Sequence, residues 1–100
     1  MPREQHDWTE LDALVALYLT KFYEESPARF KQDVLVIRLR NLHPTIKVGS
    51  IDMAIKNFRY LLGWPGGLSS VSQLGQYVFD KYNHLTLEEL KAEIDRRFNA

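Results

Sequence analysis

The side chains with the clearest binding chemistry lie on residues 50–62. At about 100° per residue, a helix over this stretch separates an apolar side from a polar one. The apolar side carries Ile51, Ala54, Ile55, Phe58, Leu61 and Leu62, and the polar side carries Asp52, Met53, Lys56, Asn57, Arg59 and Tyr60. The apolar side is expected to pack, which leaves the polar side free to bind a partner.

The basic residues are concentrated around this stretch. Counting Asp, Glu, Lys and Arg, residues 1–25 carry two positive and six negative charges, residues 26–65 seven and two, and residues 66–100 four and five. The formal net charge of the chain is zero, which argues against tight nonspecific binding to nucleic acid. The middle third is nevertheless basic, as a binding surface for an anionic partner requires.

No pattern of catalytic or metal-binding residues is found. The chain has no cysteine, and His6, His43 and His84 lie far apart in sequence, so they are expected at the surface or in turns. The glycines after residue 62 form neither a phosphate loop nor a dinucleotide fingerprint. The adjacent carboxylates at 24–25 and 88–89 fall at predicted helix ends, where they are solvated or compensate the helix dipole. We therefore expect a non-catalytic protein without metal or cofactor.

Five helices are predicted to position the polar side chains: residues 9–23, 26–43, 50–62, 69–83 and 86–98. Each begins at a residue that caps helices well: Thr9, Ser26 followed by Pro27, Ser50, Ser69 or Ser70, and Thr86. Gly63 is suited to the left-handed conformation that ends a helix. Residues 34–40 are rich in β-branched side chains and would also suit a strand, but no partner strand is visible, so a helix is preferred.

The helical spacing also predicts which faces are buried. The first helix is apolar almost all round, which indicates a central position. In the second helix the predicted buried positions are Phe30, Val34, Leu35, Ile37, Leu39 and Leu42. In the fourth they are Val71, Leu74, Val78 and Tyr82, and in the fifth Leu87, Leu90, Ile94 and Phe98.

These elements predict one all-α domain over residues 1–100. Residues 1–7 are expected to be a flexible N-terminus, residues 8–62 a three-helix core and residues 68–98 two C-terminal helices. The apolar share of 45% and the charged share of 26% are those of an ordinary soluble globular protein. No apolar run is long enough to cross a bilayer and no signal sequence is present, so a cytoplasmic protein is expected.

The order of short motifs resembles the N-terminal module of bacterial HNH-type restriction endonucleases over roughly residues 8–82. The matching motifs are Trp8-Thr9-Glu10, Leu14, Leu17 and Tyr18, then Val36-Ile37 and Leu39, then Ser50-Ile51, Ile55 and Asn57-Phe58, then Gly67-Leu68-Ser69, Leu74, Val78 and Tyr82. The layout is also similar to the Myb or homeodomain type of helix-turn-helix, whose third helix enters the major groove. The resemblance thus implies a helix-turn-helix-like core within the five-helix domain.

The resemblance implies a DNA-recognition module alone, because the histidine and cysteine motifs of the nuclease domain are missing. The residues expected to contact double-stranded DNA on the third helix are Lys56, Asn57, Arg59 and Tyr60; asparagine and arginine can pair with adenine and guanine edges. Arg38, Arg40 and Lys47 would contact the DNA backbone, with Lys47 in place of an arginine common in the family.

The alternative is a protein-interaction module, such as a phage or bacterial accessory factor that uses this scaffold to bind a nuclease. The zero net charge and the acidic first third favour it. The sequence predicts neither the oligomeric state nor the DNA target.

Overall fold

The computed structural model describes residues 7–68 and 71–100, and this part of the chain is helical without strands. Its elements are α1 (Glu10–Phe22), the 3-10 helix η1 (Pro27–Gln32), α2 (Val34–Leu42), α3 (Val48–Leu62), α4 (Gln73–Tyr82) and α5 (Leu87–Phe98). The predicted all-α, five-helix fold is confirmed, with η1 as an additional short element. None of the described helices is long and apolar enough to span a membrane.

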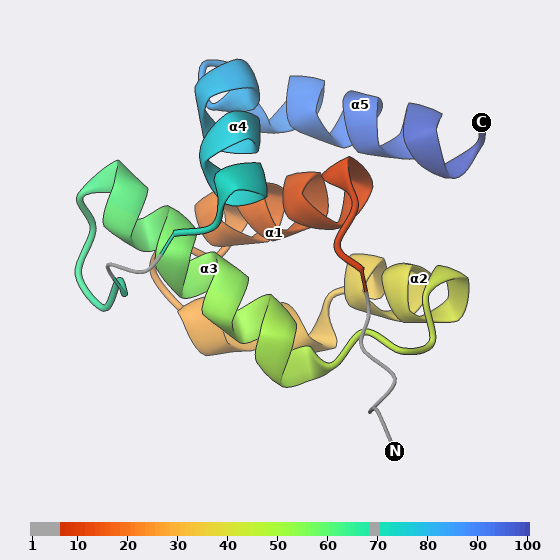
Figure 1. The fold of residues 1–100 in the computed structure, drawn as a ribbon, viewed down its shortest axis with the longest axis horizontal. Coiled ribbons are helices and arrows are strands. Elements are labelled where there is room, and N and C mark those ends of the chain that lie inside the picture. Colours follow the sequence, from red (N-terminus) through yellow and green to blue (C-terminus); the bar gives the residue numbers. More distant parts are fainter. Residues whose placement is uncertain (1–6, 69–70) are drawn as a thin grey trace.

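Helix α1 is the centre of the fold, as its apolar sequence predicts. Every residue from Leu11 to Thr20 is buried, and Leu14, Leu17 and Leu19 are fully enclosed. The other long helices surround it: α3, α4 and α5 all pack directly against α1 (Figure 1). One core therefore serves all five helices.

The predicted single helix over residues 26–43 is wrong, because the chain breaks at Asp33. There the backbone is extended, and the Asp33 carboxylate accepts hydrogen bonds from the Leu35 amide at 2.8 Å and the Tyr23 hydroxyl at 2.7 Å. Asp33 therefore caps a new helix, α2, after the short η1. The strand alternative for residues 34–40 is not observed.

The break changes which side of α2 is buried. Leu35, Val36 and Leu39 are enclosed as part of the core. The other apolar residues predicted to be buried here are exposed: Val34 by 60%, Ile37 by 57% and Leu42 by 51%. Helix α2 therefore presents an apolar stripe to solvent.

The predicted helix starts are confirmed for α1 and α5 and revised for α3 and α4. Thr9 and Thr86 form capping boxes with the residues three positions later. Helix α3 begins at Val48, before the predicted cap Ser50, and ends as expected at Gly63 with φ of +76°. Ser69 and Ser70 lie outside the described residues, and Ser72 caps α4.

Residues 8–62 contain the helices α1, α2 and α3 and the short η1, so the predicted three-helix segment is present. Here α3 packs chiefly against α1 and α4, whereas the main helical contact of α2 is with η1. Of the segment predicted to be a flexible N-terminus, residues 1–6 lie outside the described residues.

Candidate functional site: a basic hollow at the start of α3

Arg59, predicted to read bases, is part of the interior. Only 8% of it is exposed. Its Nε donates to the Pro65 carbonyl at 2.8 Å, its Nη1 donates to the Glu24 carbonyl at 3.2 Å, and its guanidinium lies over the Trp64 ring. The prediction of an exposed Arg59 is wrong because the chain after α3 folds back over this side of the helix.

The other three predicted residues of α3 do not form one surface. Lys56 pairs with Asp52, one turn earlier, at 3.0 Å, and both side chains are partly exposed. Tyr60 is half exposed. Asn57 is half-buried and lines a separate groove against the start of α4, and its Oδ1 has no hydrogen-bond partner. Only Lys56 and Tyr60 therefore remain available on the outer side of α3.

Arg38, predicted to contact the DNA backbone, links α2 to α5. Its Nη1 donates to Asp95 at 3.1 Å, and its guanidinium carbon lies 4.3 Å from the centre of the Phe98 ring. Lys91 also pairs with Asp95, at 3.0 Å, as the four-residue spacing predicts. The pKa of Asp95 is lowered by the hydrogen bond from Lys91, and also by the one from Arg38, against the opposing effect of desolvation. The charge of Arg38 is therefore largely compensated within the fold.

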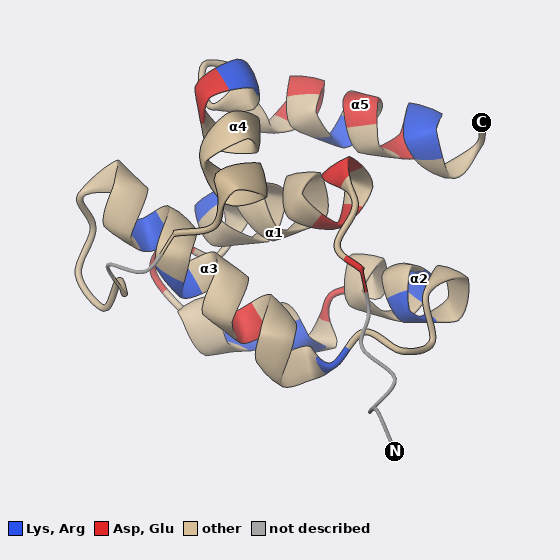
Figure 2. Cartoon of the chain, viewed as in Figure 1, with Lys and Arg blue, Asp and Glu red and all other residues tan. Residues whose placement is uncertain are grey.

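Arg40 and Lys47, in contrast, lie together at the start of α3. Arg40 donates from Nε to the Ile46 carbonyl at 3.3 Å, which holds the guanidinium beside the segment that leads into the helix. Lys47 is the exposed N-cap residue of α3. Figure 2 shows basic residues on α2 and on the segment that enters α3.

A hollow of about 370 Å³ opens at this place between η1, α2 and α3. Its lining residues are Lys31, Val36, Ile37, Arg40, Asn41, Pro44 and Val48. We call these residues, together with the adjacent Lys47, the basic hollow. None of them is acidic, so the hollow has positive charges over an apolar floor. Lys31 was not among the predicted contacts; the only sequence signal for it was its place in the basic middle third.

The N-terminus of α3 borders the basic hollow through Val48. The other four α-helices have a side chain that accepts a hydrogen bond from their first turn. In α3 the side chain of the N-cap residue, Lys47, accepts no such bond, and no acidic residue lies in the first turn. Nothing lies within 4 Å of the position that a Cβ of Gly49 would take, so the turn is open. Free amides and the helix dipole attract anions to such an end.

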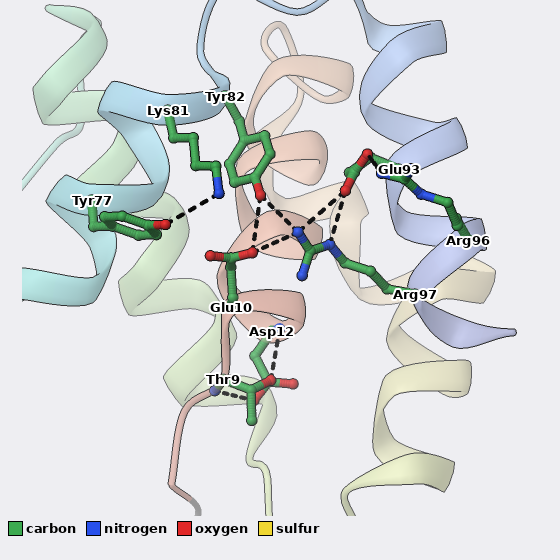
Figure 3. Close-up of polar contacts among 9 residues, drawn as sticks. All are labelled: Thr9, Glu10, Asp12, Tyr77, Lys81, Tyr82, Glu93, Arg96 and Arg97. Carbon is green, nitrogen blue, oxygen red and sulfur yellow. Dashed lines mark hydrogen bonds and ion pairs between the residues drawn. The ribbon is translucent and has the colours of Figure 1, made fainter. Parts of the chain in front are cut away.

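A second polar cluster joins α1, α4 and α5 (Figure 3). Arg97 lies 2.6 Å from Glu10 and 3.2 Å from Glu93, and it donates to the Tyr82 hydroxyl at 2.7 Å. The Tyr82 hydroxyl donates in turn to Glu10 at 2.9 Å. Partial burial alone would raise the pKa of Glu10, but the Tyr82 hydrogen bond and the Arg97 charge together lower it. Arg97 thus pairs with two carboxylates and one hydroxyl, and the cluster holds three helices together.

His43 is a turn residue, as predicted, but it also contacts the core. It ends α2, and its Nδ1 lies 2.9 Å from a carboxylate oxygen of Asp12, which is fully buried in the first turn of α1. Among residues 7–68 and 71–100, no group of three His, Asp or Glu side chains could hold a metal ion.

Comparison of the chain with protein-family models, curated proteins and solved structures finds no significant match. The resemblance to the N-terminal module of HNH-type endonucleases therefore stays a prediction. The geometry of the basic hollow is the stronger basis for a function.

Proposed function

We propose that this chain is a non-catalytic module that binds the phosphate backbone of double-stranded DNA through the basic hollow. The observation that carries the proposal is the hollow at the start of α3, which Lys31 and Arg40 line and beside which Lys47 is the N-cap residue of the helix. Three cations at a helix N-terminus, without an acidic residue in the lining, are suited to one or two adjacent phosphates.

In this mode of binding the chain contacts the DNA backbone, whereas the sequence predicted that α3 contacts the edges of the bases. Arg59 and Arg38 are engaged within the fold, and Asn57 lines a different groove. Lys56 and Tyr60 lie farther along the exposed side of α3, where they extend the contact toward the groove of the DNA. Because phosphates carry no direct sequence information, binding should depend little on DNA sequence.

The decisive test is the salt dependence of binding to a fluorescently labelled duplex, measured by anisotropy at low and moderate salt. Replacing Lys31 and Lys47 together by alanine should weaken binding and reduce the slope of log K against log salt by about 2, since each phosphate contact contributes about 0.9. Both side chains are exposed, so the fold should be retained.

The matched control removes two positive charges from the other end of the chain. Lys81 on α4 and Arg96 on α5 are both exposed and lie outside the basic hollow. The Lys81→Ala/Arg96→Ala variant should keep the wild-type slope. An equal loss in both double variants, or no binding of the wild type at low salt, would refute the proposal.

A second candidate function, binding to another protein, is favoured by the apolar stripe of α2. Val34, Ile37 and Leu42 are each more than half exposed, and Ile37 also lines the basic hollow. Apolar side chains rimmed by cations are suited to an acidic amphipathic helix of a partner such as a nuclease.

If the chain binds a protein through the apolar stripe of α2, the complex should persist at moderate salt. In affinity capture from the native host, Ile37→Glu/Leu42→Glu should lose the partner while Leu87→Glu on α5, where Leu87 is also exposed, should retain it. Capture that is equal for both variants, or no stable partner for the wild type, would exclude the α2 stripe as the binding surface.

A further inference from the structure

A second concavity lies on the other side of α3, in the groove between this helix and the start of α4. Its volume is about 400 Å³, within the range of roughly 300–1,000 Å³ that is typical of small-molecule sites. Its lining residues are Trp8, Ala13, Ser50, Met53, Ala54, Asn57, Phe58, Val71, Ser72, Leu74 and Gly75. The basic hollow shares none of these residues, so the two concavities are separate.

The lining of this groove restricts the kind of molecule that would fit. None of its described residues carries a charge, and most are apolar or aromatic. A charged ligand would lose its hydration there without gaining an ion pair, whereas a neutral apolar ring would bury its surface. Met53, which is 56% exposed, adds a flexible and polarisable side chain that adapts to the shape of a ligand.

A ligand in an apolar groove is oriented by a polar group in the wall, and Asn57 can supply that group. Asn57 lines the groove, and its Oδ1 is shielded from water and accepts no hydrogen bond, so the folded chain leaves this acceptor unused. The terminal torsion of asparagine is broad and roughly two-fold, so rotation of the amide can turn the oxygen toward a ligand in the groove. A buried acceptor without a partner is costly, and a donor on the ligand would remove that cost.

We propose that this groove binds a neutral, mainly apolar small molecule with one N–H or O–H group, which donates to Asn57 Oδ1. The site is formed by α3, the start of α4 and the segment that precedes α1. It is independent of DNA or protein binding at the basic hollow, so either proposal can fail without the other.

The test uses two isomeric probes, 3-methylindole and 1-methylindole. They have the same number of atoms, but only 3-methylindole has an N–H group. In two-dimensional NMR of the ¹⁵N-labelled protein, both should shift the amides of Ala54, Asn57 and Gly75. The affinity for 3-methylindole should be about tenfold higher, because it alone pairs with the unused acceptor.

Two variants make the test specific. Asn57→Leu removes the acceptor at similar volume, so the two isomers should bind equally. Ala54→Leu fills the groove, so both should bind more weakly. If Asn57→Leu does not fold, the proposal is tested by the relative affinity of the two isomers for the wild type and by their weaker binding to Ala54→Leu.

Three results would overturn the proposal. One is that neither isomer shifts the groove amides up to its solubility limit. Another is that the isomers bind the wild type equally. The third is that these amides shift with protein concentration alone, which would show that a second copy of the chain occupies the groove.

Discussion

Arg59 joins three segments of the chain through one guanidinium group, which bonds the carbonyls of Glu24 and Pro65 and covers the ring of Trp64. Two backbone carbonyls of exposed residues thus share one largely buried charged donor. Removing it loses both charge-assisted hydrogen bonds and leaves a gap beside the Trp64 ring. Arg59 is therefore expected to matter for stability rather than for contact with a partner.

We predict that Arg59→Ala lowers the free energy of unfolding by about 2–3 kcal/mol, the range for hydrogen bonds from a charged group that is largely buried. Arg59→Lys keeps the charge but cannot reach both carbonyls with a planar fork, so it should restore less than half of the loss. Urea unfolding followed by circular dichroism measures both. A loss below about 0.5 kcal/mol for Arg59→Ala, as expected for an exposed side chain, would contradict the structure.

The hydrogen bond between Tyr23 and Asp33 can be tested through the ionisation of the Tyr23 phenol. The hydrogen bond from its hydroxyl to Asp33 raises the pKa of Tyr23 to about 12, and desolvation acts in the same direction. The bond stabilises the neutral phenol, so its contribution is complete below the ordinary value of 10 and is lost as the pH rises from there through about 12.

Ultraviolet titration of the phenol absorbance should therefore show one tyrosine ionising near pH 12, and this tyrosine should be missing in Tyr23→Phe. In Asp33→Asn the same group should ionise closer to pH 10, because the carboxylate that favours the neutral form is gone. An unchanged titration curve in Asp33→Asn would show that the Tyr23–Asp33 bond does not form in solution.

At the scale of elements, the turn after α3 is held against the helix by close backbone contact. The position that a Cβ of Gly67 would take lies 2.5 Å from the Tyr60 nitrogen and 2.6 Å from its Cα. The next amide, that of Leu68, donates to the Lys56 carbonyl at 3.2 Å. The glycine at 67 therefore permits the turn to lie on α3 and to cover Arg59.

We predict opposite effects for two glycine-to-alanine substitutions in this region. Gly67→Ala should destabilise the protein by about 1–3 kcal/mol, because the added methyl group meets backbone that cannot move aside. Gly49→Ala, in the open first turn of α3, should stabilise it by about 0.5–1 kcal/mol, because alanine favours the helix. Thermal unfolding of both variants measures the difference, and a neutral Gly67→Ala would show that the turn does not rest on α3.

How far apart two contacting residues lie in the sequence determines whether their contact can be predicted from it. Thr9 and Thr86 are both correctly predicted as helix caps, because each caps through a residue only three positions later. Asp33, where the chain breaks, is held not only by its local bond to the Leu35 amide but also by Tyr23, ten positions earlier. The buried Arg59 bonds the Glu24 carbonyl, 35 positions earlier. Helical periodicity carries no information about such distant contacts, which is why these two predictions failed.

The residues of the candidate site were likewise predictable only in part. The resemblance implied Arg40 and Lys47 as contacts to the DNA backbone, and both lie at the start of α3. The addition of Lys31 and the removal of Arg38 require knowledge of how η1 and α5 lie beside α2. A helical wheel shows which residues share a side of one helix but not which neighbouring segment covers that side.

At the scale of the whole molecule, all five α-helices share a core with α1 at its centre (Figure 1). Helices α3 and α5 both pack against α1 and have few contacts with each other. Loss of α5 should therefore reach α3 through α1 and, by way of the Arg97–Tyr82 bond, through α4. The network of Glu10, Tyr82 and Arg97 strengthens this dependence, because it ties the first turn of α1 to α4 and α5.

We predict that Leu90→Ala, a substitution in α5, destabilises the entire chain by about 2–5 kcal/mol, because Leu90 is fully buried and leaves a cavity. The loss should appear at the same urea midpoint in helical circular dichroism and in the fluorescence of Trp8 and Trp64, neither of which lies on α5. Leu87→Ala, at an exposed position on the same helix, should change stability by less than about 0.5 kcal/mol. If fluorescence kept the wild-type midpoint while circular dichroism shifted, α5 would unfold separately, and α1 would not couple the helices into one cooperative unit.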